Sequence, residues 1–426
     1  MNIYQSRKRA CKRKSKTVIC IFIFFALAAI VACTNANVDQ QPEHGLIYNA
    51  ETYSNDESAT LYPPESTLET EPAVEAEPVP EPEPATPESS FIAIAAGTTA
   101  SFGLTEDGRM WAWGGGTGLT RRESLPILFM EDVSAIASGP THAFAIDRNG
   151  RLWGFGSNNF GEIGDNTTQF RAEPVHVMDN IIAVAVGHNH TVVLDVYGVV
   201  WTWGSNSSGQ LGNGTNDDSF LPIRAIDNIV AIAAGEAHSA ALDDEGVVWT
   251  WGSNDRGEIG VENVEEQLYP ISIKYNVRAI QSGGSSVYAI TYDGVLWGWG
   301  HNHTGQLGDG TRDNHFSPIQ IMYDAASVYS SVWYTAMVIT TDGTLWTFGV
   351  NLFGQMGTGE VEADWARGIH PQRILEGVVA AAGGGGHSLA LDVYGNVLSW
   401  GRNDYGQLGD GTRVERHSPE LVISWE

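Results

Sequence analysis

Short apolar runs separated by glycine-bearing polar segments cover the chain from residue 91 to its end. The pattern is clearest between residues 229 and 276, which contain four apolar runs: 229–234, 238–242, 247–252 and 271–274. Runs of this length that are rich in Val, Ile and aromatic residues are typical of the strands of an antiparallel meander. No segment with helical periodicity lies between the runs, which rules out a parallel sheet with crossover helices. The pattern predicts an all-β domain with four strands in each unit.

The unit repeats seven times along the chain. Each copy contains a short aromatic segment that ends in glycine, and these glycines are Gly114, Gly156, Gly204, Gly252, Gly300, Gly349 and Gly401. Successive glycines are 42, 48, 48, 48, 49 and 52 residues apart, and residues 91–426 make up seven units of 48. A period of this length with four strands per unit indicates four-stranded sheets arranged radially. We therefore predict a seven-bladed β-propeller over residues 91–426.

Two aromatic columns and one column of small residues fit this architecture. The first aromatic column consists of Trp111, Trp153, Trp201, Trp249, Trp297 and Trp346. The second consists of Trp113, Phe155, Trp203, Trp251, Trp299, Phe348 and Trp400. We expect these large side chains to fill the space between neighbouring blades. Alanine-rich first runs, such as residues 231–234, suit strands that crowd round a central axis.

The same positions carry a longer motif: Gly-x-x-His, then Gly-x-Val-Trp-x-Trp-Gly-x-Asn, Gly-Gln-Leu-Gly and Pro. This motif resembles the repeat of the regulator of chromosome condensation family, and the resemblance covers all of residues 91–426. Six copies keep a Gly-[Gln/Glu]-[Leu/Ile/Met]-Gly element, at 161–164, 209–212, 257–260, 305–308, 354–357 and 406–409. The resemblance implies a seven-bladed propeller, in agreement with the repeat count.

The first copy departs from the motif. Residues 114–118, Gly-Gly-Gly-Thr-Gly, replace the loop, so we expect the first blade to be shorter and less regular than the others. The sequence leaves two ways to close the ring. If the first run of each copy is the innermost strand, every blade is one contiguous copy. If the fourth run is innermost, residues 421–424 complete the first blade as a clasp.

The charge of the chain falls into three zones. Residues 1–33 carry seven basic residues and no acid, residues 34–90 carry thirteen acids and no Lys or Arg, and residues 91–426 carry 16 basic and 38 acidic residues. The formal net charge of the whole chain is −28. Proteins that grip nucleic-acid phosphate or an anionic membrane surface need a cationic face. We therefore expect no nucleic-acid partner.

The first zone has the composition of an export signal. A basic stretch precedes fifteen apolar residues, 18–32, which are too few to span a bilayer comfortably. The ending Ile30-Val31-Ala32-Cys33 resembles the lipobox of bacterial lipoproteins. This resemblance implies that residues 1–33 are a lipoprotein-type signal peptide ending at Cys33, which carries a lipid that anchors the mature chain to the membrane; the alternative is an uncleaved signal anchor. In both cases the rest of the chain is exported to the bacterial cell envelope, on its extracellular or periplasmic face.

Residues 34–90 are predicted to be a disordered acidic linker rich in proline. Prolines remove backbone donors and like charges repel, so we expect this segment to be extended and solvated. Cys11 and Cys20 would leave with the signal peptide, so the mature chain would keep Cys33 alone. An exported domain without a disulfide must be stabilised by packing.

Three features that suggest chemistry are better explained by structure. Histidines recur three residues after the first-run glycine, at His142, His190, His238 and His387. One histidine per blade is too dispersed for ligands that lie about 2 Å from one metal ion, so we expect each to bond to neighbouring backbone. Asp-Gly-Thr loops such as 309–311 offer one acid each, whereas calcium takes about six to eight oxygens. The run Gly383–Gly386 lacks the helix and lysine of a phosphate-binding loop, so we predict no catalytic, metal-binding or cofactor-binding residue and no cofactor.

Recognition is better supported than catalysis. The residue before the loop glycine changes identity between copies: Phe160, Ser208, Arg256, Thr304, Phe353 and Tyr405. It lies in the longest connections of the repeat, where packing restricts the sequence least and binding residues collect. Trp333 and Trp365 lie outside the packing columns. Trp365 has Asp364 and Arg367 beside it, a mixture typical of interface hot spots, although a tryptophan that folds back on its own loop is the alternative. The candidate partner-binding residues are Phe160, Arg256, Phe353, Trp365 and Tyr405.

These features favour an exported, lipid-anchored, non-enzymatic scaffold that binds a protein or a cell-wall component through its loops. The founding member of the family is a nuclear nucleotide-exchange factor that docks on chromatin, a role that does not suit an exported acidic propeller. A secreted bacterial inhibitor of β-lactamase is similar in scaffold and compartment, but no inhibitory residue aligns. Two alternatives stay open: a propeller enzyme, either a lyase or a hydrolase, with an axial site, and a structural or adhesive surface protein.

Overall fold

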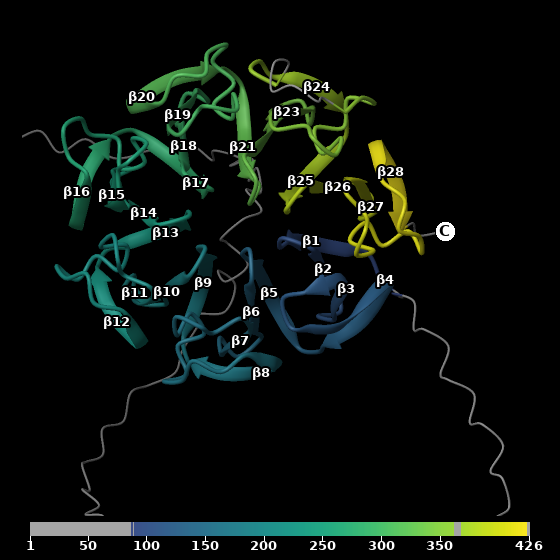
Figure 1. The fold of residues 1–426 in the computed structure, drawn as a ribbon, viewed down its shortest axis with the longest axis horizontal. Coiled ribbons are helices and arrows are strands. Elements are labelled where there is room, and N and C mark those ends of the chain that lie inside the picture. The colour runs from purple at the N-terminus through teal and green to yellow at the C-terminus, as the bar shows by residue number, and fades with distance from the viewer. Residues whose placement is uncertain (1–86, 88, 362–367, 424–426) are drawn as a thin grey trace, which may run out of the picture. The chain divides into compact units, whose positions relative to one another are not determined.

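Seven antiparallel sheets form a ring. The computed structural model describes residues 87, 89–361 and 368–423. Within these residues lie 28 strands, and the strands form seven four-stranded sheets around a common axis (Figure 1). These residues include no helix long and apolar enough to cross a membrane. The predictions of an all-β fold and of a seven-bladed propeller with four-stranded blades are confirmed.

Each blade is one contiguous copy of the repeat, with its strands hydrogen-bonded in chain order. Blades 1 and 2 contain β1 (Phe91–Ala96), β2 (Ala100–Thr105), β3 (Met110–Gly116), β4 (Leu119–Met130), β5 (Val133–Ser138), β6 (His142–Asp147), β7 (Leu152–Gly156) and β8 (Arg171–Met178). Blades 3 and 4 contain β9 (Ile181–Val186), β10 (His190–Asp195), β11 (Val200–Gly204), β12 (Ser219–Ile226), β13 (Ile229–Ala234), β14 (His238–Asp243), β15 (Val248–Ser253) and β16 (Glu266–Lys274). Blades 5 and 6 contain β17 (Val277–Gly283), β18 (Ser286–Thr291), β19 (Leu296–Gly300), β20 (His315–Met322), β21 (Ala325–Ser330), β22 (Thr335–Thr340), β23 (Leu345–Gly349) and β24 (Gln372–Leu375). Blade 7 contains β25 (Val378–Gly383), β26 (His387–Asp392), β27 (Val397–Gly401) and β28 (Arg416–Ile423).

The ring closes without a shared strand. The first strands β1, β5, β9, β13, β17, β21 and β25 surround the axis (Figure 1). In the described residues the last strand, β28, pairs with β27 of its own blade, and β1 pairs with β2. The prediction that the first run of each copy is the innermost strand is therefore confirmed. The alternative, in which residues 421–424 complete the first blade, is wrong.

The glycine run Gly383–Gly386 lies at the seam between the last and first blades. The amide of Gly385 donates to the carbonyl of Gly97 at 3.1 Å. A Cβ on Gly384 would lie 2.4 Å from the carbonyl oxygen of Gly97, and one on Gly385 would lie 2.6 Å from that of Thr98. Glycine at these positions therefore allows the two blades to approach each other, which explains the run without a phosphate ligand.

Blade 1 differs from the others as its sequence suggests. A turn at Thr117 and Gly118, with φ of 49° and 85°, joins β3 directly to β4 in place of the long loop. The shorter connection is as expected, but β4, at 12 residues, is the longest strand in the described chain.

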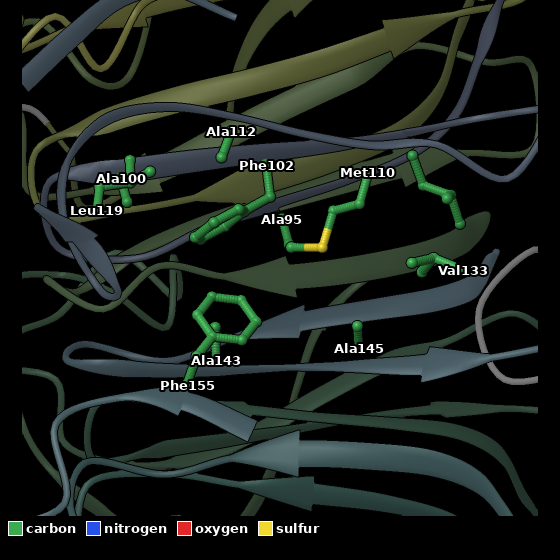
Figure 2. Close-up of a cluster of buried hydrophobic side chains, with 11 residues drawn as sticks. Ala95, Ala100, Phe102, Met110, Ala112, Leu119, Val133, Ala143, Ala145 and Phe155 are labelled. Carbon is green, nitrogen blue, oxygen red and sulfur yellow. The ribbon is translucent and has the colours of Figure 1, made fainter. Parts of the chain in front are cut away.

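The hydrophobic core consists of separate layers between blades. Seven clusters of buried side chains occur in the described residues, and each combines residues of two neighbouring blades. Between blades 1 and 2, Phe102 and Met110 face Val133, Ala143 and Phe155 (Figure 2). The rings of Phe102 and Phe155 meet edge to face at 5.8 Å. The stability of the propeller therefore depends on contacts at the seams.

The second aromatic column seals these seams, as predicted. All seven of its members are fully buried. The indole nitrogen of Trp251 also donates to the carbonyl of Gln210 in the preceding blade at 2.9 Å, and the same bond is made by Trp113, Trp203, Trp299 and Trp400. The first column packs beside the second on the same side of each blade but is half-buried, except for Trp111.

We expect Trp251→Phe to lower the free energy of unfolding by about 2–3 kcal/mol, because it removes one buried hydrogen bond and three ring atoms from a fully buried site. The column already holds Phe155 and Phe348, so a phenyl ring fits. Urea unfolding followed by circular dichroism measures the change. Trp249→Phe is the matched control: Trp249 is half-buried and donates to Asp243 of its own blade at 2.9 Å, so its loss should be smaller. Equal losses at the two positions would contradict the role of the inter-blade bond.

Candidate recognition surface

The two faces of the ring are built from different connections. The loops between the first and second strands and those between the third and fourth strands lie together, as shown by the bond from Ser253 N to Ala237 O at 2.9 Å. We call this end the loop face. The tight turns between the second and third strands lie with the links between blades, as shown by the bond from Tyr292 N to Asn276 O at 3.1 Å. We call that end the turn face.

A buried asparagine organises each long connection on the loop face. In blade 4, Asn254 Oδ1 accepts from the amide of Ile259 at 3.1 Å, while its Nδ2 donates to the carbonyls of Val261 and Val264 at 2.7 Å each. The same acceptor role recurs at Asn158, Asn206, Asn302, Asn351 and Asn403. Sequence analysis gave this asparagine no role, although its recurrence in the motif was a usable signal.

The Gln or Glu of each Gly-[Gln/Glu]-x-Gly element fixes the backbone of the variable position. Its side-chain oxygen accepts the amide two residues earlier, at 2.8 Å for Arg256, 2.9 Å for Phe353 and 2.8 Å for Tyr405. The side chains of Arg256, Phe353 and Tyr405 take no part in this bond, whereas the hydroxyl of Thr304 donates to the same oxygen at 2.6 Å. Those three side chains are therefore presented by a rigid loop and remain available for other contacts.

The histidine column joins neighbouring blades. His142, His190, His238 and His387 are fully buried, and each Nε2 lies 2.6–3.0 Å from a Ser or Thr hydroxyl of the next blade. The partner is thus a side-chain hydroxyl and not the neighbouring backbone that we expected. Each hydroxyl donates its own proton to a carbonyl, as Ser239 does to Gln210 at 2.9 Å, so it accepts from a neutral imidazole. Because each hydroxyl is buried and already donates to a carbonyl, these pairs are structural bonds and not nucleophile–base pairs.

Burial determines the ionisation of the histidine column. It lowers the pKa of His142, His238 and His387 to about 3 and that of His190 to about 4. A Cβ on Gly235 would lie 2.1 Å from Cε1 of His238, so the glycine of Gly-x-x-His leaves room for the ring. The motif therefore encodes a neutral inter-blade contact.

The acids of the Asp-Gly-Thr loops serve their own loops. Asp410 accepts from the amide and the hydroxyl of Thr412 at 2.9 and 2.7 Å and from Asn403 at 3.2 Å. Burial tends to raise the pKa of Asp410, but these hydrogen bonds outweigh it and the net pKa is lowered. In the part of the chain that the structure describes, no three His, Cys, Asp or Glu side chains gather in a way that could hold a metal ion.

Aromatic and cationic side chains of blades 6, 7 and 1 meet on the loop face. The guanidinium carbon of Arg402 lies 5.2 Å from the ring centre of Phe353 and 5.9 Å from those of Trp333 and Tyr405. That of Arg122, in blade 1, lies 4.1 Å from the Tyr405 ring. Such cation–π contacts hold the arginines in fixed orientations.

A second cluster continues from the residue next to Trp333. The carboxylate of Glu236 accepts from Ser285 at 2.7 Å and from the hydroxyl of Tyr334 at 3.3 Å, and it pairs with Arg256 at 3.3 Å. The ring of His301 lies 5.0 Å from that of Tyr334. Burial raises the pKa of Glu236, but the Ser285 bond and the Arg256 charge outweigh it, so the net pKa is lowered and Glu236 stays ionised.

We call the two clusters together the arc; its members are Arg122, Glu236, Arg256, Ser285, His301, Trp333, Tyr334, Phe353, Arg402 and Tyr405. The arc brings together three of the predicted residues, Arg256, Phe353 and Tyr405. Phe160 is 41% exposed in blade 2, and no described ring contact joins it to the arc. Cys33 and Trp365 lie outside the described residues, as do the predicted signal peptide and almost all of the predicted linker.

Sequence analysis missed several members of the arc. The position before the motif asparagine is serine in blades 2, 3 and 4, but it is His301 in blade 5 and Arg402 in blade 7. Departure from the repeat at this position was therefore a signal for the arc.

Comparisons with known proteins agree with the fold. The model of the RCC1-like domain matches residues 173–425, which is more than half of the chain. Models of the regulator of chromosome condensation (RCC1) repeat match residues 149–194, 91–117 and 133–162. A curated relative, the probable E3 ubiquitin-protein ligase HERC3 of Homo sapiens, is 49% identical over 53 residues, which are 12% of this chain and 5% of that protein. The chain therefore matches only a small part of HERC3.

Solved structures show the same architecture. Human WBSCR16 matches with a TM-score of 0.66 and 22% identity over 74% of this chain and 94% of its own. Prp20p from Saccharomyces cerevisiae matches with a TM-score of 0.68 and 21% identity over 75% of this chain and 87% of its own. At this level of identity the likeness establishes the fold alone. Together with the family model, it shows that the chain belongs to the RCC1-like domain family.

Proposed function

We propose that this protein is an exported, lipid-anchored binding scaffold that recognises a protein partner through the arc on its loop face. The observation that carries the proposal is the arc itself. Blades 4 to 7 and blade 1 contribute aromatic rings and arginines to it. The fold itself does not require this cluster, because the other blades form without it. Trp, Tyr and Arg are the residues most enriched in binding hot spots.

The charge of the arc distinguishes it from the rest of the domain. Residues 91–426 carry 16 basic against 38 acidic residues, yet the Phe353–Tyr405 part of the arc holds Arg122 and Arg402 with one paired acid, Asp404, at 2.7 Å from Arg402. Trp333 is 36% exposed beside them. An exposed indole next to arginines fixed by aromatic rings offers a partner both apolar area and directed donors.

The use of the same fold by other proteins supports a binding role. The structural study of Prp20p concerns its binding to Gsp1p and histones, and another solved structure shows Kap60 bound to yeast RCC1 (Prp20), with a TM-score of 0.66 and 19% identity over 83% of this chain and 91% of that one. These partners belong to those proteins. For this chain they support protein recognition as the kind of function.

Arg402→Ala combined with Tyr405→Ala is expected to weaken binding of the envelope partner at least tenfold, because it removes all four cation–π contacts that orient this end of the arc. A photo-crosslinking amino acid at Phe353 of the full chain should capture the partner in intact cells, and its yield from the double variant should fall accordingly. The matched control is Phe160→Ala, in the same column of blade 2 but outside the arc, which should leave the yield unchanged. Equal capture by the double variant and the parent would refute the role of the arc.

The anchoring part of the proposal has its own test. Mass spectrometry of the mature N-terminus should find a lipid on Cys33, and Cys33→Ala should release the chain from the membrane fraction. A mature chain that keeps residues 1–32 would establish the uncleaved anchor instead, without bearing on the arc.

A further inference from the structure

The turn face carries a set of exposed tyrosines that packing does not explain. Tyr275, Tyr292 and Tyr323 are 64%, 64% and 63% exposed. Tyr292 lies in the turn between β18 and β19 of blade 5, Tyr275 in the link from blade 4 to blade 5, and Tyr323 in the link from blade 5 to blade 6. Tyr197 and Tyr394, each 78% exposed, lie in turns of blades 3 and 7. Large exposed aromatic residues gathered on one face of a soluble domain often mark an interaction site.

Two of these tyrosines lie close together. The amide of Tyr292 donates to the carbonyl of Asn276, which follows Tyr275 directly, at 3.1 Å. The ring of Tyr292 extends towards the turn of blade 4, where a Cβ on Gly246 would lie 3.3 Å from it. The side chains of Asp244 and Glu245, in that same turn, are exposed. Tyr292 therefore bridges two blades beside a pair of carboxylates. We call Tyr275, Tyr292, Tyr323 and the acids around them the tyrosine sector.

The tyrosine sector has an excess of negative charge. Its exposed acids are Asp244, Glu245, Asp293, Asp324, Asp342 and Glu376. The three basic residues of the sector are all engaged: Lys274 lies 3.5 Å from the ring centre of Trp297, Arg278 donates to the carbonyls of Ala325 and Ala326 at 2.7 and 3.1 Å, and Arg373 pairs with Glu376. The charge of Lys274 also attracts Asp293, so four acids remain without a basic partner among the described residues of the sector.

We propose that the tyrosine sector binds a cationic polypeptide segment, rich in Lys or Arg, of a second protein. Tyrosine faces attract ammonium and guanidinium groups, and carboxylates on both sides strengthen this attraction and repel anionic partners. The acid excess selects a cationic ligand over a neutral one. The sector lies on the opposite face from the arc, so the proposal is independent of the proposed function and gives the ring two binding faces.

The test uses the full mature chain and a synthetic ten-residue peptide of alternating Lys and Ser, with a Glu-Ser peptide as its counterpart. Fluorescence anisotropy at 50 mM and 300 mM salt should show binding of the Lys-Ser peptide that weakens with salt, and no binding of the Glu-Ser peptide. Tyr275→Ala combined with Tyr292→Ala should weaken binding at least fivefold. Because both side chains are mainly exposed, the unfolding midpoint should not change.

Two matched controls separate a site from general attraction to an acidic protein. Tyr197→Ala with Tyr394→Ala removes two even more exposed tyrosines outside the sector. Glu262→Gln with Asp313→Asn removes two exposed charges from the opposite face. Neither should change the affinity by more than twofold, whereas Asp244→Asn with Glu245→Gln should lower it at least threefold. Equal effects of sector and control variants would overturn the proposal. So would sedimentation showing that the parent chain self-associates through the tyrosines, because a second copy would then occupy the sector.

Discussion

Lowering the pH from 7 to 5 is expected to reduce the free energy of unfolding by about 6 kcal/mol through the four fully buried histidines and Glu258 together; His301, whose pKa burial lowers to about 4, adds to this loss. The pKa values of the four histidines are about 3 to 4 in the folded chain, because burial disfavours the charged form, and 6.5 when unfolded. A lowered histidine pKa gives stability that is fully present above pH 6.5 and is lost as the pH falls towards the folded value. At pH 5 the unfolded chain has gained these protons and the folded chain has not, which costs about 2 kcal/mol for each histidine, or about 8 kcal/mol for the four.

Glu258 opposes this loss in part. Burial raises its pKa to about 7, so between pH 7 and pH 5 the folded chain gains a proton there and recovers about 2 kcal/mol. Urea unfolding at several pH values measures the net slope. His238→Thr is the diagnostic variant, because Thr335 already occupies this column in blade 6 and donates to the Val350 carbonyl at 2.8 Å. The variant should be less stable at pH 7, but its loss between pH 7 and pH 5 should be smaller by about 2 kcal/mol. An unchanged slope would show that His238 does not titrate in this window.

Glu258→Gln is expected to raise the free energy of unfolding at pH 8 by about 3 kcal/mol. Glu258 is 3% exposed, and its Oε2 accepts from the amide of Arg256 at 2.8 Å. The pKa of Glu258 is 4.5 in the unfolded chain and about 7 in the folded chain. The folded state therefore loses stability as the pH rises from 4.5 to 7, because its buried carboxyl group resists ionisation. An amide keeps the hydrogen bond and carries no charge, as Gln210, Gln306, Gln355 and Gln407 do in the same column. The stability gain should vanish below pH 4.5.

Glu162→Gln is the matched control for this substitution. Glu162 occupies the same column in blade 2, but its two oxygens accept from the Ser157 hydroxyl at 2.7 Å and from the Phe160 amide at 2.6 Å. In the amide, the oxygen keeps the Phe160 bond and Nε2 donates to the Ser157 hydroxyl, which changes from donor to acceptor, so this variant should gain no stability. Differential scanning calorimetry at pH 8 compares the two variants with the parent. A stabilised Glu162→Gln, or a Glu258→Gln no more stable than the parent, would contradict the explanation.

Features that repeat along the chain could be predicted from the sequence, because each copy gives the same information again. The first strand of blade 4 was predicted at residues 229–234 and is β13, Ile229–Ala234. Its fourth strand was predicted at 271–274 but begins at Glu266. Residues 266 and 267 pair with Ser253 and Gly252, and no apolar run marks that part of the ladder. Periodicity therefore located the strands but not the full length of the outermost one.

Contacts between blades were harder to predict because they join residues about one repeat apart. His142 contacts Thr191 and His190 contacts Ser239, both 49 residues along the chain. A search for columns of hydroxyl residues offset by one repeat would have found these partners. Arg122 and Tyr405 meet only because the ring closes, so their contact depends on which strand is innermost. The sequence left that choice open, and the full extent of the arc could not be predicted without it.

The manner of ring closure has a consequence for the order of the chain. Among the described residues, no sheet contains strands from both ends of the ring. The backbone could therefore be opened at any of the six links between blades and rejoined between residues 90 and 423 without dividing a sheet. The closing seam holds the same kinds of contact as the others, with Trp113 bonded to Gln407 at 3.0 Å and Ser101 to His387 at 2.9 Å. The cyclic succession of blades therefore specifies the architecture, and the location of the chain ends is interchangeable. A circular permutant that begins with any blade should reach the same ring.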